Sequence, residues 1–257
     1  MKVVCIGDSL TYGNVGYSYF YFLYNYMGYD YINKGKNGDS LRGMFSRLKK
    51  IVNNPNTDSD LYIIGIGTND ILLPYLRDSS PFWFLLMSSR CKIKRCIEDD
   101  ETFYQEYNEL LNFLHERNKK VIIFGMPFIN LEKFPDEKLV KRNKMIEDLS
   151  KKYNYPFIDI YKLQKEKIQP DNRVYTWKYR FLLRSNKVPG KPPDAKHRGR
   201  VGFLLRIFDY IIMTLVPISK NYFAKIRGLT TTVDGVHFSY ESAKILAIEI
   251  AKNIYYI

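Results

Sequence analysis

The stretch KVVCIGDS, at residues 2–9, decides the fold that we expect for this chain. Residues 2–6 form a short apolar run, which indicates a buried β-strand. The run stops at Gly7, and the polar residues Asp8 and Ser9 follow directly. Strands that are apolar on both faces are typical of parallel sheets, because helices cover both sides of such sheets.

The rest of the chain repeats this alternation of apolar strands and helices. Further strands are predicted at residues 29–33, 61–66, 120–125 and 157–160, and helices at residues 17–27, 40–52, 102–117, 136–153 and 239–254. The alternation predicts a parallel sheet between two helical layers. Because crossover connections are right-handed, we expect a three-layer, doubly wound α/β/α domain. For its sheet we expect the common strand order 2-1-3-4-5.

Two segments do not fit this alternation. Residues 72–100 interrupt the third crossover, and residues 161–229 separate the fifth strand from the last helix. The second segment is too long for a plain loop, so we expect it to be a folded insertion. We therefore predict one domain over residues 1–257, with a core of residues 1–160 and 230–257 and these two insertions.

The positive charge of the chain is concentrated before the last helix. The net charge is +13, and residues 162–228 hold sixteen Lys and Arg against four Asp and Glu. The same segment contains a nearly continuous apolar run, residues 201–216, which is shorter than the ~20 residues of a membrane span. A second apolar run, residues 81–87, lies in the smaller insertion and is also flanked by basic residues.

Three interpretations of these runs remain open. They pack on each other as a lid or extra core, they attach the protein to an anionic membrane surface, or the basic segment binds nucleic acid. The third has least support, because no recognised nucleic-acid motif accompanies the charge. Without a visible secretory signal, we expect a cytoplasmic protein, peripheral at the membrane under the second interpretation.

Polar turns follow three strands that are neighbours in the expected order. Ser9 follows the first strand, Asn37 and Gly38 follow the second, and Asn69 and Asp70 follow the third. Ligands of open parallel sheets bind at the carboxyl ends of the strands. We therefore expect these turns to converge on one pocket.

A serine in such a pocket needs a base to take its proton. Of the three histidines, His115 and His197 lie among charged residues and are expected on the surface. His237 follows Asp234 by three positions, and Gly235 between them allows a tight turn. Asp234 can accept a hydrogen bond from one ring nitrogen while the other nitrogen faces Ser9.

Together these residues resemble the four sequence blocks of the SGNH, or GDSL, hydrolases, in order. The blocks are Gly7-Asp8-Ser9-Leu10, then Asn33, Gly35 and Gly38, then Gly67, Asn69 and Asp70, and finally Asp234 and His237. The resemblance implies a flavodoxin-like three-layer fold and ester hydrolysis through an acyl-serine, with no metal or cofactor. It implies that Ser9 is the nucleophile, His237 the general base and then acid, and Asp234 the residue that orients His237.

The resemblance also implies an oxyanion hole made of the Ser9 amide, the Gly38 amide and the Asn69 side chain. Asp8 is expected to brace the turn by hydrogen bonds. The expected activity is that of a carboxyl-ester hydrolase acting on a lipid acyl ester or an acetylated glycan. Two alternatives remain: an acyltransferase that uses the same site, and an inert SGNH-fold protein that docks to anionic surfaces.

Overall fold

A five-stranded parallel sheet lies at the centre of the protein. The computed structural model describes residues 1–24, 28–79, 81–168 and 220–255. The strands are β1 (Lys2–Gly7), β2 (Asp30–Gly35), β3 (Leu61–Gly65), β4 (Lys120–Phe124) and β5 (Phe157–Ile158). Their order, β2-β1-β3-β4-β5, and their parallel pairing confirm the predicted flavodoxin-like, doubly wound sheet.

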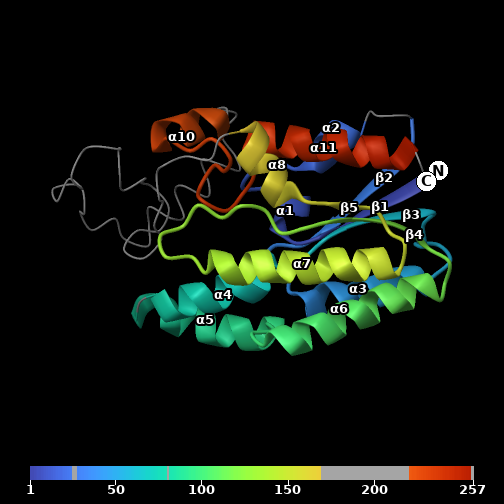
Figure 1. Cartoon of the computed structure of the whole chain (residues 1–257), viewed down its shortest axis with the longest axis horizontal. Coiled ribbons are helices and arrows are strands. Elements are labelled where there is room, and N and C mark those ends of the chain that lie inside the picture. The colour runs from blue at the N-terminus through green and yellow to red at the C-terminus, as the bar shows by residue number, and fades with distance from the viewer. Residues whose placement is uncertain (25–27, 80, 169–219, 256–257) are drawn as a thin grey trace.

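Helices cover both faces of this sheet and complete the three predicted layers (Figure 1). On one face lie α2 (Tyr19–Leu23), α8 (Ile160–Lys167) and α11 (Tyr240–Tyr255). On the other face lie α3 (Leu41–Val52), α4 (Thr68–Ser79), α5 (Pro81–Lys94), α6 (Asp100–His115) and α7 (Asp136–Lys152). Two apolar clusters fill the spaces between sheet and helices, one on each face.

Side-chain caps fix where several helices begin. Ser40 precedes α3, and its Oγ accepts a hydrogen bond from the Gly43 amide at 3.1 Å. Ser239 precedes the last helix, α11, and its Oγ accepts one from the Ser242 amide at 3.3 Å. Such caps satisfy amides that have no partner within the helix. The side chains of Ser40 and Ser239 therefore define where α3 and α11 begin.

The smaller predicted insertion is part of a helical layer. Trp83, Met87 and Cys91 recur every four residues along α5, and their side chains are buried in the core of that face. Phe84 and Leu85 on the same helix are exposed. The apolar run at residues 81–87 thus contributes to the core on one side of α5.

The larger predicted insertion is described only at its ends. The helices α8 and α10 (Lys220–Arg227) border it. The apolar run at residues 201–216, most of the charge of residues 162–228 and His197 lie outside the described residues. None of the helices in the described part of the chain has the length and apolarity that crossing a membrane requires. Contact with an anionic membrane surface therefore stays a prediction.

Candidate active site

Ser9 is the first residue of a one-turn helix, α1 (Ser9–Tyr12), directly beyond the end of β1. Asp8 caps this helix, and its Oδ1 accepts a hydrogen bond from the Leu10 amide at 2.9 Å. Gly13 ends the turn with φ +79° and donates its amide hydrogen to the Ser9 carbonyl at 2.9 Å. The turn is thus closed at both ends, and the Ser9 side chain stays partly accessible.

The structure brings Ser9, His237 and Asp234 together across 228 positions of sequence. His237 Nε2 lies 3.1 Å from Ser9 Oγ, and His237 Nδ1 lies 2.7 Å from Asp234 Oδ2. The other carboxylate oxygen, Oδ1, accepts the amides of Val236 at 3.0 Å and His237 at 2.8 Å. Gly235 has φ +92°, which allows the tight turn that the sequence predicted.

The two charged partners shift each other's pKa in opposite directions. Burial raises the pKa of Asp234, but attraction to His237 and the hydrogen bonds from His237 and Val236 outweigh it and leave the pKa below its ordinary value. Burial lowers the pKa of His237, but the charge and hydrogen bond of Asp234 leave it above the ordinary value. Both shifts favour a carboxylate that can stabilise a protonated imidazole.

The loop that carries Asp234 and His237 is anchored by its backbone. The Val233 amide donates to the His237 carbonyl at 2.8 Å, and the Asn130 amide donates to the Gly235 carbonyl at 2.8 Å. The Tyr17 amide donates to the carbonyl of Phe238 at 2.9 Å, which ties this loop to the segment after Ser9. Backbone hydrogen bonds before, within and after the Asp234–His237 turn therefore fix the position of His237.

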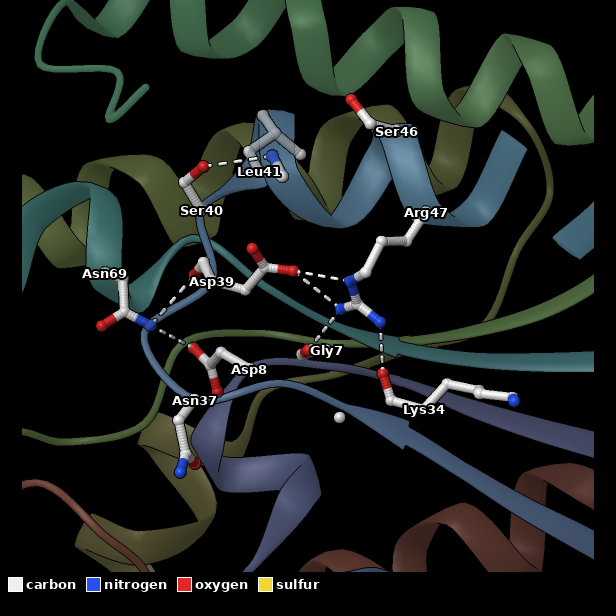
Figure 2. A network of polar contacts seen from close by, with 12 residues as sticks. Gly7, Asp8, Lys34, Asn37, Asp39, Ser40, Leu41, Ser46, Arg47 and Asn69 are labelled. Atoms are coloured by element: carbon white, nitrogen blue, oxygen red, sulfur yellow. Dashed lines mark hydrogen bonds and ion pairs between the residues drawn. The ribbon is translucent and has the colours of Figure 1, made fainter. Parts of the chain in front are cut away.

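Asn69 lies in the first turn of α4, where the sequence predicted a separate turn after β3. Its Nδ2 donates to Asp8 Oδ2 at 3.1 Å and to the Asp39 carbonyl at 3.0 Å, as Figure 2 shows. A side-chain amide has two hydrogens, and these contacts use both. In this arrangement Asn69 bridges the loops that follow β1 and β2.

Asp8 braces the turn as the sequence predicted, by its contacts with Leu10 and Asn69. Its side chain is buried, and burial raises its pKa to about 7 against the opposing effects of the Leu10 amide and His237. Asp70 has a similar bracing role, because its carboxylate accepts the amides of Leu41 at 2.8 Å and Ile97 at 2.9 Å.

Gly38 is buried and has φ +64°, a conformation that glycine adopts without strain. The next residue, Asp39, accepts a hydrogen bond from Arg47 Nε at 2.8 Å. Arg47 also donates to the carbonyls of Lys34 at 2.6 Å and Gly7 at 3.0 Å (Figure 2). This arginine therefore fixes the loop after β2 to the ends of β1 and β2.

Lys220, at the start of α10, is a site residue that the sequence did not reveal. Its Nζ donates to the carbonyls of Gly16 at 2.8 Å, Asn14 at 3.1 Å and Gly13 at 3.3 Å. A Cβ placed on Gly16 would lie 2.7 Å from the Cβ of His237, so this loop packs directly against the base of the His237 side chain. Lys220 lies in the basic segment, but no spacing or motif distinguished it from the other cations there.

The remaining histidine of the described chain, His115, ends α6 on the surface, as predicted. Within the described ranges, no group of three or more His, Cys, Asp and Glu side chains is arranged to hold a metal ion.

A serine, an imidazole and a carboxylate in hydrogen-bonding sequence, at the strand ends of a parallel sheet, are the groups of a serine hydrolase. The chain matches the GDSL-like Lipase/Acylhydrolase family over residues 3–250. It belongs to this family and is an ester-bond hydrolase.

Solved structures of esterases share the fold. The acetyl xylan esterase AlAXEase matches with a TM-score of 0.57 and 14% identity, covering 99% of this chain and 100% of that one. The acetylxylan esterase Axe2 from Geobacillus stearothermophilus matches with a TM-score of 0.55 and 17% identity, covering 98% and 93%. A putative acylhydrolase from Bacteroides fragilis matches with a TM-score of 0.56 and 15% identity, covering 99% and 86%. No curated protein sequence matches the chain.

Catalytic mutants of Axe2 are also among the matching structures. Each of them replaces one serine, one aspartate or one histidine by alanine. In that enzyme the replaced aspartate lies three positions before the replaced histidine.

Proposed function

We propose that this protein hydrolyses carboxyl esters through an acyl-serine intermediate, with Ser9, His237 and Asp234 as its catalytic triad. The observation that carries the proposal is the continuous contact from Ser9 Oγ to His237 at 3.1 Å and from His237 to Asp234 at 2.7 Å. The catalytic serine, aspartate and histidine named for Axe2, with the same spacing of the last two, support it.

In the acylation step, Ser9 Oγ attacks the ester carbonyl carbon while its proton passes to His237 Nε2. Asp234 holds the Nδ1 hydrogen and stabilises the imidazolium that forms. The tetrahedral intermediate then collapses, the bond to the alcohol oxygen breaks, and His237 returns its proton to the departing alkoxide. A water molecule repeats the sequence on the acyl-serine, releasing the acid and restoring Ser9.

The negative oxygen of each tetrahedral intermediate needs hydrogen-bond donors. We assign this role to the amides of Ser9 and Gly38 and to the side chain of Asn69. Because both Asn69 hydrogens are already donated to Asp8 and Asp39, one of them has to turn towards the oxyanion as it forms. Asp8, whose pKa is raised to about 7, is the partner that we expect to release it, since its protonation weakens the contact.

The substrate is a carboxyl ester of a carbohydrate or a lipid. An acetylated glycan is supported by the acetyl xylan esterases that share the fold, and a lipid acyl ester by the family to which the chain belongs. Hydrolysis and acyl transfer share the acyl-serine, and the partially exposed Ser9 favours water as the acceptor.

Replacing the nucleophile tests the proposal. The Ser9→Ala variant should fold normally and lose turnover of para-nitrophenyl acetate, because no hydroxyl remains to form the acyl-enzyme. Ser46→Ala, an exposed serine on α3, is the matched control and should keep wild-type rates. Wild-type turnover by folded Ser9→Ala protein would refute the assignment.

A further inference from the structure

The guanidinium of Arg90 lies directly against Gly38. A Cβ placed on Gly38 would be only 2.5 Å from Arg90 Nη2. Since a Cα–Cβ bond is about 1.5 Å long, this nitrogen lies within about 4 Å of the Gly38 Cα. Arg90 projects from α5, a helix of the segment that interrupts the third crossover, and it reaches the loop to which we assign one oxyanion donor.

Arg90 differs from the other arginines near the site, because it has no polar partner among the residues that the structure describes. Arg47 is bound by the Asp39 carboxylate and two carbonyls, and Arg42 pairs with Glu106. Within the described residues, Arg90 forms no hydrogen bond and no ion pair, although its side chain is partly buried. A partly buried cation without a counter-charge attracts an anion more strongly than a fully solvated one does.

The surroundings of Arg90 carry an excess of positive charge. Lys94, one turn further along α5, contacts the Asn37 carbonyl at 3.5 Å and lies 3.9 Å from Asp39. Burial lowers the pKa of Lys94, and the charge of Asp39 does not offset this fully. Three neighbouring cations lower it further: Lys36, Arg90 and Arg47.

A second polar atom beside Gly38 also lacks a partner. The side-chain oxygen of Asn37, Oδ1, is buried and accepts no hydrogen bond from any described residue. Buried polar atoms without partners in a native protein mark places that water or a ligand completes. Because Oδ1 is an acceptor, it can take a hydrogen from water or from a ligand hydroxyl, while the guanidinium over Gly38 is the group that can bind an anion.

We propose that Arg90 is an anion-binding subsite beside the oxyanion hole, and that the natural substrate is an ester bearing a carboxylate or phosphate group within a few bonds of its scissile carbonyl. This inference rests on the proposed function of the same site. The guanidinium presents a planar pair of donors that matches either oxyanion group. Arg90 would then orient the carbonyl towards Ser9 while the substrate charge replaces the missing counter-ion.

Two pairs of esters test this inference and show which side of the ester carries the charge. Mono-para-nitrophenyl glutarate and its methyl ester differ in charge on the acyl side, and O-acetylglycolate and its amide differ on the alcohol side. For at least one pair, wild-type kcat/KM should favour the anion. In Arg90→Gln that preference should fall by about tenfold or more, because a charge-assisted hydrogen bond is lost.

Two further variants separate the subsite from a general effect of charge. Lys92→Gln removes one positive charge from an exposed position on the same helix and should keep the wild-type preference. Arg90→Lys keeps the charge but loses the planar pair of donors, so it should retain part of the preference. Added salt should weaken the preference of the wild type, since the contact is electrostatic.

Anion binding can also be measured without turnover. In NMR titrations, glutarate should bind the wild type at least about tenfold more tightly than glutaramide does, and Arg90→Gln should lose this difference. An unchanged anion preference in folded Arg90→Gln for both ester pairs, or equal binding of glutarate and glutaramide to the wild type, would overturn the inference. Failure of the proposed function gives a different result: para-nitrophenyl acetate would then not be hydrolysed, whatever the anion binding.

Discussion

The two sides of the candidate site differ in how completely their polar groups are paired. On the side of the last loop, His237 contacts Ser9 and Asp234, and the remaining Asp234 oxygen is held by two amides. On the side of the loop after β2, both Asn69 hydrogens are donated within the protein, while Arg90 lacks any described partner.

This difference separates two tasks in ester hydrolysis. Proton transfer needs a base that is already aligned with its serine. The contacts of His237 with Ser9 and Asp234 are therefore in place before the substrate binds. The oxyanion side stabilises charge that appears only during the reaction. In the free protein Asp8 and Asp39 hold the two hydrogens of Asn69, and we expect the oxyanion to take one of them. Changes on the first side should therefore have the larger effects on turnover.

Among the predictions below, Asp234→Asn should reduce kcat most. The substitution removes the charge that stabilises the imidazolium and holds its tautomer, an effect that reaches ~10⁴-fold in serine proteases. We expect kcat to fall far more than KM rises. The comparison is with Asp148→Asn, an exposed carboxylate on α7. A loss below about twofold would mean that Asp234 does not orient the histidine.

The same variant should move the pH dependence of kcat/KM. The base acts in its neutral form, so kcat/KM rises with pH through the pKa of His237, which the Asp234 carboxylate holds above its ordinary value. Without that charge, the midpoint of the rise should shift to lower pH. A midpoint that does not move would show that the titrating group is not this imidazole.

On the oxyanion side, Asn69→Ala should reduce kcat by ~10²–10³, the effect of removing one oxyanion donor. Because Asn69 also bridges Asp8 and Asp39, thermal unfolding must be measured alongside. Asn108→Ala is a matched control. Asn108 lies on α6, outside the candidate site, and its side-chain oxygen accepts hydrogen bonds from Lys152 and Tyr153. Destabilisation with unchanged kcat would leave Asn69 as a brace only.

The smallest predicted effect concerns Lys220. Its positive charge lowers the pKa of His237, and its Nζ holds three carbonyls of the loop that packs against the base of that side chain. Lys220→Met should raise the midpoint of the pH profile by a fraction of a unit and lower kcat modestly. Lys225→Met, exposed on the same helix, should do neither. A purely structural role for Lys220 would lower stability without moving the midpoint.

The sequence predicted the parts of the molecule that local patterns determine. The apolar runs located the strands, and the common strand order of doubly wound sheets is the order observed. The spacing of Asp234 and His237 predicted their contact, because three residues with a glycine can form a closed turn. The distant contact with Ser9 then followed from its place at the end of β1.

Other features depend on packing that no local pattern records. Arg90 and Lys220 are two of the forty Lys and Arg residues of the chain, and nothing in their neighbourhood in sequence shows that they reach Gly38 and the loop after Ser9. The sequence also does not show that both Asn69 hydrogens are donated within the protein, since one acceptor is the backbone carbonyl of Asp39. The helices α8 and α10 were missed because they lie in a segment interpreted as an insertion.

Covalent labelling tests the central claim most directly. A fluorophosphonate reacts with a serine only when a neighbouring base activates its hydroxyl. We predict that the probe modifies the wild type at a single site, that the labelled peptide contains Ser9, and that Ser9→Ala and His237→Ala are not labelled. Modification at another residue, or an unlabelled Ser9 in the folded wild-type protein, would contradict the assignment of Ser9 as a nucleophile activated by His237.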